Sequence, residues 1–292
     1  MEWDPTQFFR EDEEIRPHRF ALVVLNQPIN ETALAVLRKH AHLTVCADGG
    51  ANRFFEWAKA RGEESTDLPT TIIGDLDSIR PEIRNHYANL GVNIVQDDDQ
   101  YSTDFTKSLR YIREHEKDVI SSSTSQRSQE QTQAPSILIL GGLGGRVDQA
   151  FSQIHHLYMV NQTQEHGSEK GNLYLISEES ITFILSEGNN TIHVPRTNRP
   201  PDPSQTKPQP SQQQEKERNE YLLEENIGII PLSGPARITT SGFQWDVSNW
   251  ETQIGGQIST SNHIRAETVS VQTNIPVLFT VELAGRLKRV SR

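Results

Sequence analysis

Two aspartates, Asp75 and Asp77, stand one residue apart after the β-branched run in the stretch TTIIGDLDSI. Side chains of an extended chain alternate between two faces, so we expect both carboxylates to point the same way and Leu76 to point into the core. Two converging carboxylates need a cation between them, and Mg²⁺ accepts such ligands. The spacing therefore predicts a metal site, unless one aspartate caps the next helix and the other is solvated.

A second acidic stretch, QDDDQYSTDFTKSL, leads into a segment with the apolar spacing of a helix. Ser102 or Thr103 can cap that helix, which places Asp104 in its first turn and Lys107 three residues later on the same face. Asp104 then suits a metal ion, and Lys107 suits a phosphate group as a point charge. A solvated acidic turn followed by an ordinary ion pair at the helix start would explain the same residues without a ligand.

Two glycine-rich turns accompany these acids. In ADGGANR, Asp48 ends a strand and Asn52 opens a helix, where backbone N–H groups favour anions. In LGGLGGRVDQ, four glycines precede Arg146 and Asp148, a pattern that is typical of a phosphate-binding turn. The second turn is neither a P-loop nor a complete G-x-G-x-x-G fingerprint. The alternatives are an ordinary β-to-α turn for the first stretch and a flexible linker for the second.

The segments that must position these residues alternate between continuous apolar runs and amphipathic stretches. This alternation predicts a mostly parallel, Rossmann-like α/β domain over residues 19–178, with both faces of its sheet covered by helices. Ligands bind beyond the carboxyl ends of such strands, so we expect the acids and both glycine turns at one sheet edge. We predict strands at 19–26, 43–47, 70–74, 92–95, 136–140 and 172–176, and helices at 30–41, 51–61, 80–91, 103–116 and 147–162.

The pattern changes near Ser180 to short strand-like segments separated by Gly, Pro, Ser and Asn, which predicts a C-terminal antiparallel β-sandwich or small barrel over 179–292. Residues 1–18 form an acidic N-terminal extension. Two inserts, at about 121–135 and 196–220, are rich in Ser, Gln and Pro, and we predict that both are disordered. We expect Trp245 and Trp250 to pack in the core, with stacking on a ligand as the alternative. The predicted strands are 181–186, 190–195, 226–233, 236–243, 255–262, 268–273 and 276–283.

The composition excludes several classes of function. The 292 residues carry 28 basic and 39 acidic side chains, and the net charge of −11 argues against nonspecific binding to nucleic acid or to an anionic membrane. No apolar run approaches the roughly 20 residues of a membrane helix, and the first residues lack the apolar core of a secretory signal. Cys46 is the single cysteine, which fits a reducing cytoplasm, and we expect it in the core. An acidic chain that binds a phosphate ester needs a divalent metal.

Several motifs occur in one order and together resemble a known family: VVLNQPI, CADGGANR, GDLDSI, STDFTKSL, LGGLGGRVDQ, GIIPLSGPARITTSGFQWDV and STSN. Over roughly residues 19–285, apart from the two inserts, the chain is similar to thiamin pyrophosphokinases (thiamin diphosphokinases) of the eukaryotic, fungal type. This resemblance implies an α/β nucleotide domain, a β-sandwich and a cytoplasmic homodimer with thiamin at the subunit interface. It also implies a Mg²⁺-dependent enzyme that transfers the pyrophosphoryl group of ATP to the hydroxyethyl group of thiamin, giving thiamin diphosphate and AMP.

The resemblance also implies roles for individual residues. The acids that organise Mg²⁺ correspond to Asp75, Asp77 and Asp104, and they form the catalytic set together with Lys107 and Arg146. As a mechanistic hypothesis of our own, we expect either Asp77 or Asp104 to accept the hydroxyl proton of thiamin, and the sequence does not choose between them. Tyr101 stands where members often carry an acid. Residues on the ATP side correspond to Asp48, Asn52, Gln100, Thr103, Lys107, Arg146 and Asp148, and those on the thiamin side to Ser259, Ser261 and Asn262.

Two other functions remain as alternatives. A nucleotide-sugar transferase of the DxD type, or another nucleotidyl transferase, would also use DLD at a strand end, although it would not account for the STSN motif or the β-rich second half. A non-enzymatic binder of thiamin or of a nucleotide would account for Tyr101 as a lost catalytic position. Formation of AMP from ATP in the presence of thiamin and Mg²⁺ separates both from a pyrophosphokinase.

Overall fold

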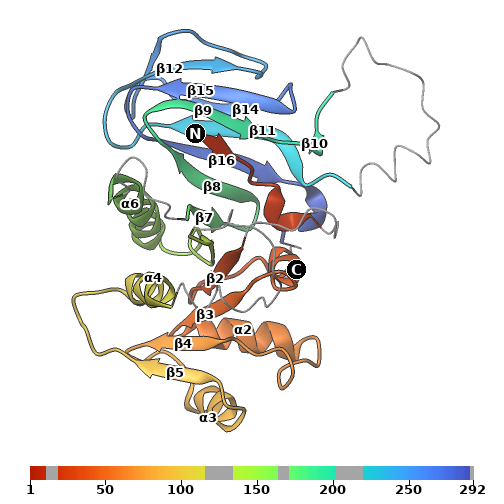
Figure 1. Cartoon of the computed structure of the whole chain (residues 1–292), viewed down its shortest axis with the longest axis vertical. Coiled ribbons are helices and arrows are strands. Elements are labelled where there is room, and N and C mark those ends of the chain that lie inside the picture. Colours follow the sequence, from red (N-terminus) through yellow and green to blue (C-terminus); the bar gives the residue numbers. More distant parts are fainter. Residues whose placement is uncertain (11–18, 116–133, 164–170, 201–219, 290–292) are drawn as a thin grey trace, which may run out of the picture. The chain divides into compact units, whose positions relative to one another are not determined.

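The computed structural model describes residues 1–10, 19–115, 134–163, 171–200 and 220–289 (Figure 1). The chain divides into two compact units. One unit, Pro17–Glu178, is called the α/β unit here. The other combines Met1–Arg16 with Glu179–Arg292 and is called the strand-rich unit. An α/β region followed by a strand-rich region is therefore confirmed, whereas the first residues of the chain belong with its last third.

The sheet of the α/β unit has the strand order β7-β6-β2-β3-β4-β5, and all neighbouring pairs in this order are parallel. Every residue of β2 and β3 is buried, as expected for strands covered on both faces. The predicted strands are all present, with slightly different ends. Their bounds are β2 (Phe20–Val24), β3 (Leu43–Ala47), β4 (Thr71–Gly74), β5 (Asn93–Gln96), β6 (Ser136–Leu140) and β7 (Leu173–Ile176).

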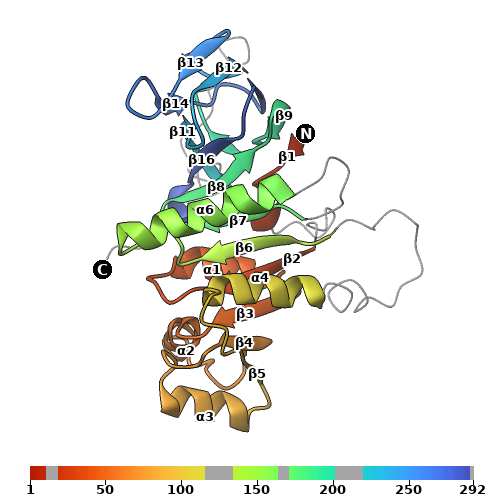
Figure 2. The same cartoon turned by 90° about the vertical axis from the view of Figure 1, so that its left-hand side faces the viewer.

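Three helices of this unit begin where the sequence supplies a cap or a proline. Asn30 accepts a hydrogen bond from the Ala33 N–H (3.0 Å), Pro81 is the first residue of its helix, and Thr103 accepts from the Thr106 N–H (3.2 Å). The α4 and α6 helices lie in front of the sheet in Figure 2. The helices are α1 (Glu31–Leu37), α2 (Gly50–Lys59), α3 (Pro81–Asn89), α4 (Asp104–Glu114) and α6 (Val147–Thr163).

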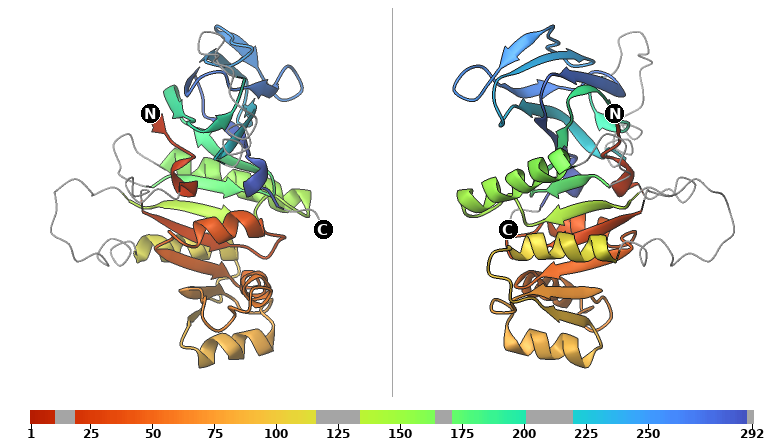
Figure 3. Two further views of the ribbon diagram at one scale, coloured as in Figure 1. Left: turned by 90° about the vertical axis from the view of Figure 1, so that its right-hand side faces the viewer. Right: turned by 60° about the vertical axis from the view of Figure 1, so that its left-hand side comes forward.

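The strand-rich unit contains two sheets, both visible in Figure 3. One has the order β1-β9-β15-β12-β13, and the other contains β10-β11-β16-β8 with β14 also paired to β11. The pairs β1–β9 and β10–β11 are parallel and the others antiparallel, so the unit is mixed rather than purely antiparallel. The strands are β1 (Glu2–Trp3), β8 (Ser180–Leu185), β9 (Gly188–His193), β10 (Thr197–Asn198), β11 (Leu223–Ile230), β12 (Ala236–Ser241), β13 (Trp250–Thr252), β14 (Ser259–His263), β15 (Thr268–Thr273) and β16 (Val277–Leu283).

The N-terminal residues are an integral part of the strand-rich unit. Trp3 is 4% exposed, stacks on Phe183 at 4.9 Å between ring centroids, and donates from Nε1 to Asn190 Oδ1 (3.0 Å). Phe8 and Phe9, in a short 3₁₀ helix, are fully buried. The predicted acidic extension covers 1–18, and its residues 11–18 lie outside the described residues. The apolar residues that precede it carry the packing.

The two inserts predicted to be disordered fall mostly outside the described residues. The second begins later than predicted, because residues up to 200 are described and two of them form β10. Thr197 is 4% exposed and its hydroxyl donates to the Val194 carbonyl (2.7 Å), which holds the chain against β11. Within the described part of the chain, no helix combines the length and apolar character needed to cross a membrane. Cys46 is fully buried, as predicted.

Candidate functional site

Three carboxylates meet at the carboxyl ends of β3 and β4. Asp48 follows β3, Asp75 follows β4, and Asp104 is the first residue of α4. One oxygen from each lies within 4.8 Å of the oxygens of the other two. Asp48 and Asp75 are brought together because β3 and β4 are adjacent parallel strands whose carboxyl ends share one edge of the sheet, and α4, which packs against both strands, brings Asp104 to them. We call these residues the carboxylate group.

The electrostatics of the carboxylate group are unfavourable without a counter-charge. Burial raises the pKa of Asp48 and of Asp104 above the ordinary aspartate value, because it penalises the charged form. Neighbouring carboxylates act in the same direction, Asp104 on the pKa of Asp48 and Asp75 on that of Asp104. Hydrogen bonds to the carboxylates partly oppose both shifts. Such a group suits a cation that would favour the ionised forms.

Asp48 is the most enclosed member of the group, at 1% exposure. Its two carboxylate oxygens accept hydrogen bonds from the Ser78 N–H (2.9 Å) and the Ile79 N–H (3.0 Å). The close approach depends on Gly74, where an added Cβ would lie 2.7 Å from Asp48 Cβ and 3.0 Å from Asp104 Oδ1. The sequence predicts Asp48 at the same sheet edge as the other acids and on the ATP side, but it does not indicate that Asp48 belongs to the metal-binding set.

Asp77 lies outside the carboxylate group. The β4 strand ends at Gly74 and Leu76 has a φ of 66°, so the chain is not extended here and the alternation of faces does not apply. The expectation that Asp75 and Asp77 converge as neighbours on an extended strand is therefore wrong, although Leu76 is buried as predicted. Asp77 is exposed, accepts from the Ser78 hydroxyl (2.8 Å), and donates its N–H to Asp75 Oδ1 (3.3 Å).

Lys107 is buried beside the carboxylate group, at 2% exposure. Its ammonium donates to the Asp97 carbonyl (2.8 Å) and to Asp104 Oδ1 (3.3 Å). The i,i+3 ion pair that explains these residues without a ligand is thus present. Because its ammonium lies against Asp104, Lys107 also supplies positive charge at the site. Thr103 caps α4, and Gln100 is exposed.

The acidic turn before α4 is organised rather than merely solvated. Asp97 forms an ion pair with Arg110 (Nη2 to Oδ2, 2.5 Å) and accepts from the Asp99 N–H (3.1 Å). Asp99 accepts from the Tyr101 N–H (2.9 Å) and the Ser102 hydroxyl (2.6 Å). These hydrogen bonds hold the pKa of both aspartates below the ordinary value. Tyr101 is fully exposed at the tip of this turn, and the part played by Arg110 has no local signal in the sequence.

The glycine-rich turn after β6 lies at the point where the strand order reverses, between β2 and β6. Gly145 has a φ of 70°, and a Cβ there would lie 2.4 Å from Gln27 Oε1 in the loop after β2. Arg146 and Asp148 follow and bind each other through two contacts, Nη2–Oδ2 at 2.6 Å and Nε–Oδ1 at 3.0 Å. Their side chains are 74% and 60% exposed, so Arg146 remains accessible to an anion.

The three STSN residues have different environments on β14 of the strand-rich unit. Asn262 is 5% exposed, and its carboxamide binds the Trp245 backbone, donating to the carbonyl (3.0 Å) and accepting from the N–H (3.2 Å). Ser261 is exposed with a φ of 56°, and Ser259 is half-buried. Asn262 therefore holds the turn that carries Trp245, while Ser261 faces outward.

Trp245 does not pack in the core, and that prediction is wrong. Its side chain is 54% exposed and lies against the His263 ring at 5.1 Å between centroids. The residue stands in the turn between β12 and β13. Trp250, at the start of β13, is half-buried and donates from Nε1 to Gln257 Oε1 (3.2 Å).

Acids, a buried lysine and a glycine-rich turn at the carboxyl ends of parallel strands define an α/β protein of the class that binds phosphorylated ligands. Comparison with known proteins specifies the family. Residues 34–166 match the thiamin pyrophosphokinase catalytic domain, and residues 212–278 match the thiamin pyrophosphokinase vitamin B1 binding domain.

Individual proteins agree with these matches. The chain is 34% identical over 282 residues to thiamine pyrophosphokinase 1 of Arabidopsis thaliana, covering 93% of this chain and 89% of that protein. It is similar to the thiamin pyrophosphokinase structure from Candida albicans (TM-score 0.73, 26% identity, 97% and 92% of the two chains). It is also similar to the yeast enzyme structure (TM-score 0.72, 25% identity, 97% and 90%). The chain belongs to the thiamin pyrophosphokinase family, which confirms the resemblance found in the sequence.

Proposed function

We propose that this protein transfers the pyrophosphoryl group of ATP to the hydroxyethyl group of thiamin, giving thiamin diphosphate and AMP. The observation that carries the proposal is the carboxylate group, with three oxygens within 4.8 Å at the strand ends, in a chain of this family. A triphosphate bound through a divalent metal is the ligand that suits such a group in an acidic protein.

The residues present fit Mg²⁺. Three carboxylates are the hard oxygen ligands this ion takes. Burial and the neighbouring carboxylates raise the pKa of Asp48 and of Asp104, and a bound cation would favour their ionised forms. We propose that Asp48, Asp75 and Asp104 hold the ion and that Asp77 lies at the rim. When bound, Mg²⁺ would supply charge neutralisation to phosphate oxygens.

The chain's own residues position the reactants and balance charge. Lys107 holds Asp104 through an ion pair and keeps a positive charge beside the carboxylate group. Arg146 is exposed enough to exchange Asp148 for a phosphate oxygen, which its guanidinium can bind in the same two-contact manner. Either Asp77 or Asp104 accepts the hydroxyl proton of thiamin at a carboxylate oxygen. Positioning and electrostatics, rather than covalent catalysis, account for the rate in such transfers.

On the thiamin side, we propose that Trp245 and Ser261 present the contact surface. An exposed indole can stack on a heteroaromatic ring, and an exposed hydroxyl can bind a polar edge of such a ring. The proposal includes the finer descriptions that the sequence suggests: a Rossmann-like fold for the α/β unit, a β-sandwich for the strand-rich unit, a homodimer and a cytoplasmic location. The single cysteine supports the last of these, because it permits no disulfide within the chain.

The test is a product assay on the purified full chain with ATP, MgCl₂ and thiamin. We expect AMP and thiamin diphosphate in equal amounts, with no AMP when thiamin is omitted. Formation of ADP would indicate transfer of a single phosphoryl group and would contradict the proposal. Binding of thiamin and ATP without AMP would instead identify a non-enzymatic binder.

A further inference from the structure

The loop between β4 and α3, residues 75–80, carries Asp75 of the carboxylate group, and its backbone is hydrogen-bonded to a side chain of α2. We propose that Asn52, on the first turn of α2, is a positioning residue that fixes this loop and thereby fixes Asp75 in the carboxylate group. This inference rests on the proposed function only in that the carboxylate group binds a divalent cation. It changes the role that the resemblance implies for Asn52, which is contact on the ATP side.

The contacts of Asn52 are with the loop backbone. Its Nδ2 donates to the Ser78 carbonyl (2.9 Å), and its Oδ1 accepts from the Arg80 N–H (3.0 Å). A carboxamide that pairs both its donor and its acceptor ends with one short peptide segment fixes the position and orientation of that segment.

The same segment is held by Asp48 from within the site. Asp48 accepts from the Ser78 and Ile79 N–H groups, so the backbone N–H groups of residues 78, 79 and 80 all donate to Asp48 or Asn52. Asp48 and Asn52 therefore both hold the backbone of the loop. Without Asn52, the Ser78 carbonyl and the Arg80 N–H lose their side-chain partner, and of the two side chains only Asp48, itself a proposed metal ligand, would still bind the backbone of residues 78–80.

The loop needs such support because its own backbone is unfavourable. Leu76 has a φ of 66°, in the left-handed region that a bulky side chain seldom occupies, and it persists only where its surroundings impose it. Asp75 lies next to Leu76, and its Oδ1 accepts the N–H of Asp77 within the same loop. A change in loop conformation would therefore move the Asp75 carboxylate away from Asp48 and Asp104.

The test is Asn52→Ala in the full chain, with Mn²⁺ as the probe in the absence of nucleotide. Mn²⁺ binding is followed by the loss of the free-ion signal in electron paramagnetic resonance. Substitution of a residue that orients a metal ligand typically lowers the metal affinity by about 10- to 100-fold, so we expect the Mn²⁺ Kd to rise by about 10-fold or more. The Mg²⁺ concentration that half-saturates AMP formation rises in parallel, while kcat is largely recovered at saturating Mg²⁺.

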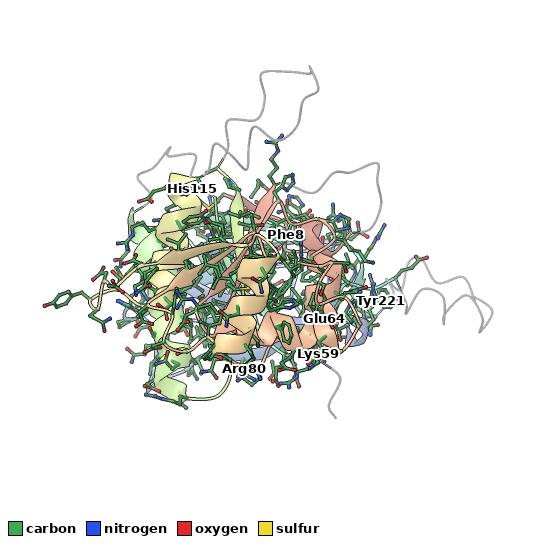
Figure 4. All side chains as sticks on the ribbon, turned by 90° about the horizontal axis from the view of Figure 1, so that it is seen from below. Phe8, Lys59, Glu64, Arg80, His115 and Tyr221 are labelled. Atoms are coloured by element: carbon green, nitrogen blue, oxygen red, sulfur yellow. The ribbon has the colours of Figure 1, made fainter. Side chains whose placement is uncertain are left out.

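Two further variants sharpen the result. Glu56→Gln, one turn later on α2, removes only the exposed ion pair between Glu56 and the Arg80 side chain (2.5 Å), and we expect less than about a 2-fold change in Mn²⁺ affinity. Arg80 is labelled in Figure 4 at the start of α3.

Asn52→Asp keeps an acceptor for the Arg80 N–H but loses the donor to Ser78, so its Mn²⁺ affinity falls between the wild type and Asn52→Ala. If Asn52→Ala does not fold, Asn52→Asp carries the test.

An unchanged Mn²⁺ Kd in Asn52→Ala, together with a raised KM for ATP, would overturn the inference and place Asn52 in contact with the nucleotide. An equal loss of Mn²⁺ affinity in Glu56→Gln would overturn it as well. The proposed function fails separately, if the wild type forms no AMP or if Asp75→Asn binds Mn²⁺ as well as the wild type does.

Discussion

The two units arrange their predicted ligand residues in opposite ways. At the carboxylate group of the α/β unit, Asp48 and Lys107 are almost fully buried and hydrogen-bond to neighbouring backbone, whereas Arg146 in the glycine-rich turn is exposed. In the strand-rich unit, the buried residue, Asn262, is only a support, and the exposed Trp245 and Ser261 are what a ligand could touch. Charge is therefore kept in a rigid, partly desolvated site, whereas aromatic stacking needs an open surface.

The difference predicts where activity and stability will be separable. In the α/β unit, the buried Lys107 is proposed both to act on the substrate and to hold the fold, so its substitution should change both properties, whereas the exposed Arg146 can be changed with little effect on stability. In the strand-rich unit, contact and support fall on different residues, so the two properties can be changed one at a time.

The largest effect is expected from Asp75→Asn. Removing one charge from the proposed metal group should lower turnover by roughly 10²- to 10³-fold at saturating Mg²⁺, because the developing phosphate charge loses its stabilisation. The measurement is AMP formation, with circular dichroism to show that the fold is retained. Near-normal turnover in a folded variant would remove the metal role of Asp75.

Lys107→Met is expected to lower both stability and activity. It leaves Asp104 and the Asp97 carbonyl without their buried partner, and the loss of one member of such a pair costs about 3 kcal/mol of unfolding free energy. Urea denaturation measures this loss. The matched variant is Arg146→Ala, which breaks an exposed pair and should cost at most about 1 kcal/mol while still lowering AMP formation. Equal stability losses in the two variants would contradict the contrast.

Asn262→Ala and Trp245→Ala test whether stability and thiamin binding depend on different residues in the strand-rich unit. Asn262→Ala removes hydrogen bonds to the Trp245 backbone and should lower the unfolding free energy by about 2 kcal/mol as well as raise the KM for thiamin. Trp245→Ala should raise the KM for thiamin with little change in stability, because the side chain is more than half exposed. If Trp245→Ala destabilises the protein as much as Asn262→Ala, the indole is structural.

The smallest effect concerns pH and the turn before α4. Asp97 and Asp99 have pKa values lowered in the folded state, so their contribution to stability is present above the unfolded value of about 4 and is lost as pH falls through the folded values. Arg110→Gln removes one cause of both shifts. Its urea midpoint should therefore converge with that of the wild type as pH is lowered from 6 to 3. A constant difference over this range would exclude the linkage.

The sequence by itself determined the family, the strands and helices of the α/β unit, and the edge at which its acids gather. These follow from local patterns: apolar runs of strand length, caps such as Thr103, and strand-end motifs that must meet at one edge of a parallel sheet. The motif order also predicted thiamin pyrophosphokinase, and the comparisons confirm that family.

Only the tertiary structure decided which acid joins Asp75 in the carboxylate group. It also decided which asparagines hold the backbone of a loop or turn instead of facing a ligand. Asp48 replaces Asp77 in the carboxylate group because a left-handed residue, Leu76, turns the loop, and a side chain from another strand reaches in. Asn52 and Asn262 bind backbone that is distant along the chain, and Trp3 packs on Phe183, which is far from it in the sequence. Such partners depend on long-range packing and on a single backbone conformation, and neither has a local sequence signal.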